Sequence, residues 1–293
     1  MTHDDNARHL KNLKPFPNGA SRLFPVVGDP IEQVRSPEIM TELFRARGEN
    51  AVVVPFHVSS FGLSAVFSTL TEVDNVGGLL VTIPHKQQAF QLCTGLTDNA
   101  VCIEAVNVVR RVENGWYGDN TDGIGFLNGI EREGFDVQGK TVLLVGCGGA
   151  GTAIGLEMLR RGAARLAIHD VDGEKRDSVI RKLDARYTGK VAMGSDDPSG
   201  FDLIANATPM GMKSNDPLPV NVTKLRSEQF AACVITKPHV SPFIEEARKR
   251  GCQTMIGAGM FDAQAEVLAD FLTGHDGHLH HSGRAPLPTS TKG

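Results

Sequence analysis

Residues 140–151 read KTVLLVGCGGAG, and this stretch decides the fold. The apolar run at 140–145 predicts a buried strand, and a helix to about residue 161 follows the glycines. Glycines at such a junction let the backbone turn tightly and approach a pyrophosphate, whose charge meets the free N–H groups of the helix N-terminus. We therefore predict a dinucleotide site, in preference to a glycine turn without a ligand, on Gly146, Gly148, Gly149, Ala150 and Gly151.

The next predicted strand, residues 165–169, ends in an acidic residue, Asp170. A carboxylate at this point, roughly 20 residues beyond the glycines, accepts hydrogen bonds from the ribose hydroxyls of NAD and repels the 2′-phosphate of NADP. We predict NAD as the cofactor, with NADP disfavoured. Asp172 is the competing partner for the ribose, and Asp170 can also be interpreted as an ordinary turn residue at a strand end.

Short β-branched runs alternate with amphipathic stretches elsewhere, which is typical of α/β proteins. Further strands are predicted at residues 23–28, 51–55, 79–83, 202–206, 232–236 and 254–256. We predict two α/β domains: residues 1–125, and a Rossmann-type doubly wound parallel sheet over residues 126–258. In residues 259–293 we predict a helix, at about 260–272, that packs back on the first domain, and then a flexible tail.

Turn and capping residues give finer predictions. Ser36 and Pro37 suit the N-cap and first position of a helix, and Gly48 suits its end. Residues 106–117 are interpreted as a β-hairpin, with Asn114 and Gly115 in a type I′ turn.

Composition excludes several function classes. The 293 residues carry a formal net charge of −4, which gives no basic footprint for nucleic acid. No apolar run approaches the roughly 20 residues of a membrane helix, and the N-terminus lacks the apolar core of a signal peptide. The five cysteines lie far apart without metal-ligand spacing, so we predict reduced core thiols and a cytoplasmic protein without a metal site. The histidines of the tail would be the alternative, as a metal cluster of His275, His278, His280 and His281.

Two motifs in the first domain place reactive groups at helix starts. The run VTIPHK at 81–86 ends a strand and brings Lys86 to the start of a helix, and GDNTDG at 118–123 does the same for Asp122. Together with Ser36 and Pro37, AVN at 105–107 and NAT at 206–208, these motifs resemble the shikimate/quinate dehydrogenase family. The motifs that resemble the family occur in the family's order from about residue 28 to residue 264. The resemblance implies that the first domain binds the substrate.

The resemblance implies a lysine–aspartate pair, Lys86 and Asp122, that moves the substrate hydroxyl proton while hydride passes to nicotinamide. Oxidising an alcohol needs a base within hydrogen-bond reach of the hydroxyl, and a shielded lysine beside a carboxylate can supply it. Taken singly, the two residues are also compatible with a solvated helix lysine and a plain helix-start carboxylate.

Further site residues follow from the resemblance alone. It implies substrate contacts from Ser36, Thr82, Asn107, Asp122 and Gln264. It implies nicotinamide-side contacts from Thr208, Gly257 and Met260. Thr208 can instead be a hydroxyl that caps a strand end, and Gln264 an exposed helix residue.

Four positions depart from the family pattern. Val34 replaces a serine that would hold the substrate carboxylate, Leu80 replaces an asparagine, and Thr236 stands where a tyrosine is usual. Asp170 replaces the arginine of an Asn-Arg-Thr motif for NADP. Losing such partners alters selectivity strongly, so the sequence leaves the substrate open among shikimate, quinate and a related cyclic hydroxy acid. It also leaves open the oligomeric state, the choice between a biosynthetic and a catabolic role, and the rival reading of a catalytically idle NAD-binding regulator.

Overall fold

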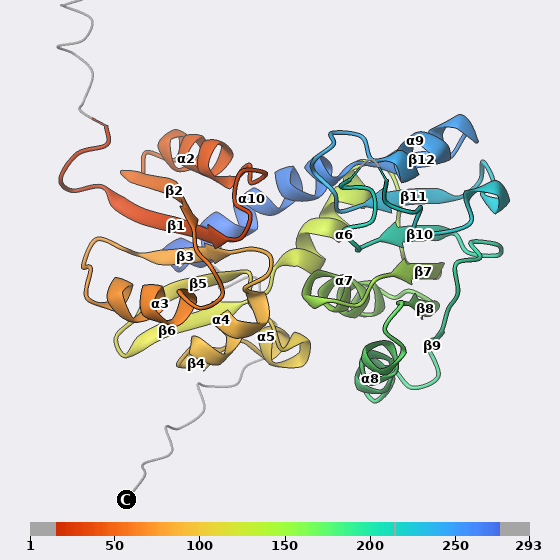
Figure 1. Cartoon of the computed structure of the whole chain (residues 1–293), viewed down its shortest axis with the longest axis horizontal. Helices are drawn as coiled ribbons and strands as arrows, with labels where there is room; N and C mark the ends of the chain where they lie inside the picture. Colours follow the sequence, from red (N-terminus) through yellow and green to blue (C-terminus); the bar gives the residue numbers. More distant parts are fainter. Residues whose placement is uncertain (1–15, 214, 276–293) are drawn as a thin grey trace, which may run out of the picture.

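The computed structural model describes residues 16–213 and 215–275. Two α/β domains lie side by side, and α6 (Asp122–Arg132) and α10 (Gly257–Thr273) run between them (Figure 1). Within the described ranges, no helix is long and apolar enough to cross a membrane. The predicted fold class, two α/β domains of which the second is Rossmann-like, is confirmed.

The first domain contains a mixed sheet with the strand order β2-β1-β3-β5-β6-β4. Within it, β5 runs antiparallel to both of its neighbours, and the other adjacent pairs are parallel. The strands are β1 (Arg22–Gly28), β2 (Ala51–His57), β3 (Gly78–Val81), β4 (Gly95–Leu96), β5 (Val108–Val112) and β6 (Gly115–Asp119). The helices are α2 (Ser36–Ala46), α3 (Leu63–Thr71), α4 (Lys86–Leu92) and α5 (Asp98–Ile103).

The second domain contains an all-parallel sheet with the order β12-β11-β10-β7-β8-β9. The chain goes outward from β7 in one direction and then from β10 in the other, so the order reverses between these two strands; in such sheets ligands bind at this switch point. The strands are β7 (Thr141–Val145), β8 (Arg165–His169), β9 (Val191–Met193), β10 (Leu203–Asn206), β11 (Phe230–Cys233) and β12 (Gln253–Met255). The helices are α7 (Gly149–Arg160), α8 (Gly173–Asp184), the short 3₁₀ helix η1 (Val222–Lys224) and α9 (Pro242–Lys249).

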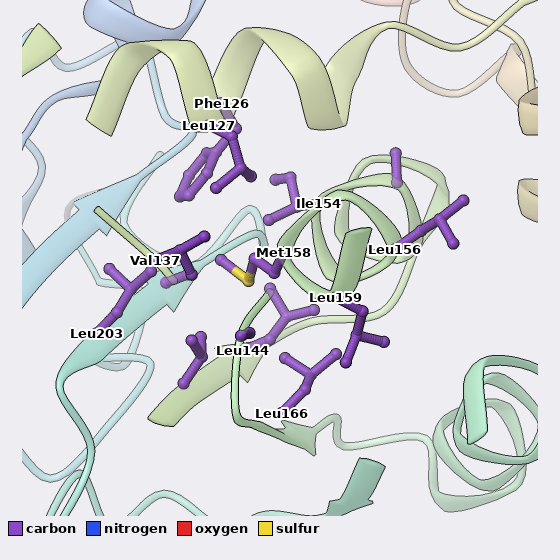
Figure 2. Packing of buried hydrophobic residues seen from close by; sticks show 14 of the residues in the cluster. Phe126, Leu127, Val137, Leu144, Ile154, Leu156, Met158, Leu159, Leu166 and Leu203 are labelled. Carbon is purple, nitrogen blue, oxygen red and sulfur yellow. The ribbon is translucent and has the colours of Figure 1, made fainter. Parts of the chain in front are cut away.

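Helix α6 begins directly after the first sheet and packs into the core of the second. Phe126 and Leu127 of α6 meet Ile154 and Met158 of α7 above the parallel sheet (Figure 2). A Cβ on Gly123 would lie 2.3 Å from the Ala153 carbonyl oxygen, so the close approach of the two helices requires glycine there. The start of α6 is therefore fixed relative to both sheets.

Helix α10 also joins the two cores. Met260 packs in the core of the second domain, while Leu268, Phe271 and Leu272 pack with Phe24 of the first. The helix begins at Gly257, a few residues before the predicted start, because its glycine-rich first turn lacks the apolar spacing that marks a helix.

Several local predictions were wrong. The hairpin turn is Glu113 and Asn114, because Val112 pairs with Gly115; neither turn residue has the positive φ of a type I′ turn, and Gly115 takes φ +129° instead. The N-cap of α2 is Arg35, so Ser36 lies one residue too far into the helix to cap it.

Other differences concern strand boundaries. The strand predicted at 232–236 lies at Phe230–Cys233, where its pairing with β10 ends. We did not predict β4 and β9, because strands of two and three residues show no periodicity. The predicted end of α2 at Gly48, with φ +75°, is confirmed.

The guanidinium of Arg111 binds carbonyl groups at the end of α3 and in the residues that follow it. It donates to the carbonyl oxygens of Leu70 (2.5 Å), Thr71 (2.8 Å), Val73 (2.8 Å) and Val76 (2.7 Å). Its carbon also lies 5.1 Å from the centre of the Trp116 ring. The Val73 and Leu70 carbonyls also accept from the backbone N–H groups of Val76 and Val73. Because the last carbonyls of a helix lack the partners of its interior, Arg111 adds a charged donor where backbone pairing is sparse.

We predict that Arg111→Ala lowers the free energy of unfolding by about 2–4 kcal/mol, because it leaves several half-buried carbonyls without a charged donor. Lys249→Ala is the control: it removes an exposed i,i+3 pair with Glu246, which is worth under about 1 kcal/mol. Urea unfolding of both variants measures the difference. Equal losses in the two variants would contradict the role given to Arg111.

Candidate active site

Three polar residues of the predicted site, Lys86, Asn107 and Asp122, lie at one edge of the mixed sheet. Lys86 follows β3 as the first residue of α4, and Asp122 follows β6 as the first residue of α6. Asn107 comes just before β5, and because β5 is antiparallel to β3 and β6, its beginning lies at the edge where they end. The topology thus brings three segments, distant in sequence, to one place.

Lys86 and Asp122 form a close ion pair. The Lys86 Nζ atom lies 2.5 Å from Asp122 Oδ2, and the two side chains are 20% and 5% exposed. Asp122 sits at the N-terminus of α6, where the helix dipole favours a negative charge. The predicted pair therefore meets in the structure, shielded from most solvent but still accessible through the lysine.

The second oxygen of Asp122 is held by amides. Asn107 Nδ2 donates to Asp122 Oδ1 over 2.8 Å, and Gln264 Nε2 donates to the same oxygen over 3.3 Å. Gln264 also donates to Thr121 Oγ1 over 2.9 Å, and it is buried rather than an exposed helix residue. One carboxylate thus joins groups from three separate segments of the chain.

Sequence reasoning missed two supporting residues, Asn120 and Thr121. Asn120 Oδ1 accepts from the Asp122 backbone N–H (3.1 Å), and its amide donates to the Ala105 carbonyl (3.2 Å). The Thr121 backbone N–H donates to Asn107 Oδ1 over 2.9 Å. Both residues are fully buried polar groups within the GDNTDG run, and their polarity in a stretch that ends a strand was the available signal.

A cavity of about 200 Å³ opens beside this network, lined by residues of both domains. Eight predicted site residues border it: Ser36, Thr82, Lys86, Asn107, Asp122, Gly257, Met260 and Gln264. The three substrate-side departures, Val34, Leu80 and Thr236, line it too. Residues that sequence reasoning did not single out complete the wall, among them Arg35, Phe261 and Leu268.

The glycine turn has the close contacts that a phosphate cradle requires. Gly146 has φ +93°, and a Cβ there would meet Thr208 Cγ2 at 2.6 Å; a Cβ on Gly151 would lie 2.0 Å from the Gly146 carbonyl oxygen. Above Gly148, by contrast, the nearest group to such a Cβ is Lys175 Nζ at 3.7 Å. A side chain would therefore clash at Gly146 and Gly151, whereas the space next to Gly148 is open. Gly148, Gly149 and Ala150 lie at the start of α7, so these residues fit a dinucleotide pyrophosphate.

The glycine turn also adjoins the ion pair. A Cβ on Gly149 would lie 3.8 Å and 3.9 Å from Cβ and Cδ of Lys86. A cofactor on this turn and a substrate in the cavity would therefore share one site, although Lys86 and the turn come from different sheets.

Asp170 is hydrogen-bonded to the glycine turn. Its Oδ2 accepts from the Cys147 backbone N–H (2.8 Å) and from Cys147 Sγ (3.3 Å). Burial by itself raises the pKa of Asp170, but the backbone N–H groups of Asp172 and Cys147 outweigh it and hold that pKa below its usual value. Burial beside this carboxylate raises the pKa of the Cys147 thiol to about 12, so the thiol stays protonated and can donate.

Asp172, Thr208 and Gly257 have close local contacts. Asp172 caps α8, because its Oδ1 accepts from the Lys175 backbone N–H (3.0 Å). Thr208 Oγ1 donates to Asn206 Oδ1 over 2.6 Å, the strand-capping contact of its alternative interpretation. A Cβ on Gly257 would lie 2.2 Å from the Ile235 carbonyl oxygen, which brings the start of α10 against the loop after β11.

The cysteines and histidines offer no metal centre in the described ranges. All five cysteines are free thiols, four of them buried. No cluster of three or more His, Cys, Asp or Glu suited to a metal occurs in residues 16–213 and 215–275. His278, His280 and His281 of the predicted tail lie outside the described residues.

Comparison with known proteins finds relatives in one family. Residues 26–109 match the family model for the shikimate dehydrogenase substrate binding domain. The shikimate dehydrogenase (NADP(+)) of Lysinibacillus sphaericus is 30% identical over 86% of this chain and 92% of its own length.

Two solved structures are similar over almost the whole chain. Shikimate 5-dehydrogenase from Listeria monocytogenes, in complex with shikimate and NAD, has a TM-score of 0.80 and 25% identity over 90% of this chain and 95% of its own. Quinate dehydrogenase from Corynebacterium glutamicum, in complex with NAD, has a TM-score of 0.77 and 25% identity over 87% and 94%. The chain therefore belongs to the shikimate/quinate dehydrogenase family, whose members are nicotinamide-dependent oxidoreductases acting on a CH–OH group.

Proposed function

We propose that the protein is an NAD-dependent dehydrogenase that transfers hydride reversibly between NAD and a ring hydroxyl of shikimate, quinate or a related cyclic hydroxy acid. The observation that carries the proposal is the Lys86–Asp122 pair, 2.5 Å apart, at the cavity next to the glycine turn. A proton-transfer group, a substrate cavity and a cofactor cradle then lie within one site.

In this proposal Lys86 moves the proton. During oxidation Nζ passes one of its protons to Asp122 Oδ2 as it takes up the hydroxyl proton, and during reduction the same relay runs in reverse and delivers a proton to the carbonyl oxygen. A nicotinamide cofactor, when bound, supplies the hydride acceptor or donor. Asp122 holds Nζ through Oδ2, while Asn107 and Gln264 hold Oδ1, so the lysine stays aimed into the cavity. Partial burial of Lys86 shields the developing charge from water, which strengthens its stabilisation by the lysine.

A catalytically idle NAD-binding regulator is the competing interpretation. Such a protein has no chemical need for a buried ion pair at a cavity, and burying a carboxylate costs free energy unless it is well partnered. Retention of Lys86, Asp122 and their amide partners therefore favours an enzyme.

We predict that the protein binds NAD more tightly than NADP. The Asp170 carboxylate, kept ionised by the backbone of the glycine turn, accepts from ribose hydroxyls and repels a 2′-phosphate. Asp170→Asn should reduce the preference for NAD about tenfold or more, whereas Asp172→Asn, which alters only the α8 cap, should leave it unchanged. Calorimetric dissociation constants for both dinucleotides test this, and NADP binding equal to or tighter than NAD binding would overturn it.

We predict that Lys86→Met lowers turnover by about 10²–10⁴-fold, because it removes the proton carrier. Methionine keeps an unbranched stem beside Gly149, so NAD affinity should change little. Asp122→Asn should lower turnover and also raise the substrate KM, since that side chain is expected to bind a ring hydroxyl.

Steady-state rates and NAD binding are to be measured for both variants. Lys224→Met is the matched control, because Lys224 forms a 2.5 Å pair with Asp197 on the exposed surface. Near-native turnover by Lys86→Met would rule out the proposed mechanism.

The apolar replacements in the cavity predict weak turnover of shikimate. Each missing polar contact in a buried site typically costs about 1–3 kcal/mol. The double change Val34→Ser with Leu80→Asn should raise kcat/KM for shikimate about tenfold or more. Val234→Thr adds a hydroxyl elsewhere on the same cavity wall and should not. Efficient turnover of shikimate at low concentration by the unaltered protein would contradict the effect that we assign to Val34 and Leu80.

A further inference from the structure

The side chain of Cys147 contacts the carboxylate on which the proposed cofactor preference depends. Cys147 lies in the glycine turn, two residues after β7, and is 1% exposed. Its backbone N–H and its Sγ atom both donate to Asp170 Oδ2, over 2.8 Å and 3.3 Å. The proposed proton transfer at Lys86 uses neither of these hydrogen bonds.

The backbone of the turn supplies only part of the restraint on Asp170. The Gly146 N–H donates to the His169 carbonyl oxygen over 2.8 Å, which aligns the glycine turn with the end of β8. Any residue at position 147 except proline offers a backbone N–H to Oδ2, whereas only a side chain with a donor adds a second bond. The bond from Cys147 Sγ is therefore a restraint that depends on the residue type.

The hydrogen bonds to Asp170 leave one acceptor site of its carboxylate for a ligand. An ionised carboxylate offers about four acceptor sites, two on each oxygen. Cys147 occupies both sites of Oδ2, and the Asp172 backbone N–H occupies one site of Oδ1 over 3.0 Å. The remaining site, on Oδ1, can accept from a ribose hydroxyl. A carboxylate restrained at both oxygens cannot rotate away from a 2′-phosphate.

The thiol keeps the proton that it donates. Burial raises the pKa of the Cys147 thiol to about 12, so the thiol is protonated at neutral pH. Burial also raises the pKa of Asp170, but the backbone N–H groups of Asp172 and Cys147, and then the thiol, outweigh burial and lower that pKa. The bond therefore joins a neutral donor to an ionised acceptor, which makes it charge-assisted.

A thiol that only fills the core is the simpler interpretation of Cys147, because free cysteine behaves as a small hydrophobic residue. Cys252 in the same domain offers a comparison. It is also buried, its Sγ donates to the Arg226 carbonyl oxygen over 3.1 Å, and it precedes β12 at the amino edge of the parallel sheet. Cys147 lies at the carboxyl edge, where such sheets bind ligands, and its partner is a carboxylate.

We propose that Cys147 is a positioning residue for cofactor selection: its thiol holds the Asp170 carboxylate against the glycine turn, so that the carboxylate accepts from the ribose of NAD and excludes the 2′-phosphate of NADP. Cys147 acts through Asp170 and not on the reacting atoms. This inference rests on the proposed NAD-dependent function, and it adds to the cofactor site a residue type that the glycine turn itself does not require.

The test measures dissociation constants for NAD and NADP by calorimetry. Cys147→Ala should lower the ratio of the NADP constant to the NAD constant about three- to tenfold, because Asp170 keeps its backbone bond but loses the second donor on Oδ2. Cys147→Ser keeps a donor at the same place, so its ratio should stay near that of the unaltered protein.

Two further variants separate positioning from packing. In an Asp170→Asn background, Cys147→Ala should not change the ratio again, because the charge that excludes the phosphate is already absent. Cys252→Ala is the matched control: it removes another buried thiol hydrogen bond of the same domain and should leave the ratio unaltered. Thermal unfolding of each variant detects any loss of folded protein.

An unaltered ratio in Cys147→Ala, an equal weakening of both dinucleotides, or a loss that Cys147→Ser does not rescue would refute the role of Cys147 alone. Tighter NAD binding by Cys147→Ala would also refute it, since the thiol would then compete with the ribose for Asp170. Failure of the unaltered protein to bind either dinucleotide, or to prefer NAD, would instead refute the proposed function and, with it, this inference.

Discussion

The constraint on which the site depends is the burial of the Asp122 carboxylate. An ion that is 5% exposed is destabilising by several kcal/mol unless its charge and its lone pairs are met. Lys86 meets one oxygen, and Asn107 and Gln264 meet the other. These partners come from α4, from the residue before β5 and from α10, so satisfying one carboxylate fixes where three elements stand around the cavity.

The two helices at this point connect the arrangement to the cores of both domains. Helix α6 begins with Asp122 and continues into the core of the second domain, and α10 carries Gln264 between side chains of both cores. A displacement of either sheet would therefore pull on the groups that hold the carboxylate. The same connection brings the Lys86 stem next to Gly149, and thus the proposed proton-transfer group next to the proposed cofactor cradle.

Much of this frame could be predicted from sequence, because it depends on local rules. The strand, glycine turn and helix around Gly146 follow from periodicity and from the conformational freedom of glycine, and Lys86 and Asp122 stand in short motifs at helix starts. The position of the hairpin turn and the short strands β4 and β9 were not predictable, because pairing with neighbouring strands determines them and each involves only two or three residues. The bond from Cys147 to Asp170 also escaped prediction, because no spacing rule says which backbone N–H a strand-end carboxylate will meet.

Wall residues such as Arg35 and Phe261 were harder to predict than the Lys86–Asp122 pair, and the reason is physical. Groups that move protons must sit in fixed geometry, and fixed geometry needs several partners, which leave motifs in the sequence. A wall residue needs only to face the ligand. Val34 and Arg35 are neighbours in the chain and both line the cavity, yet one is apolar and the other charged, and nothing in their spacing distinguishes them. Arg35 donates to Asp262, which is distant in sequence and belongs to the helix that also supplies Gln264. Helix α10 therefore completes the hydrogen-bond network around Asp122 and also holds a residue of the cavity wall, so these two parts of the cavity are connected through α10.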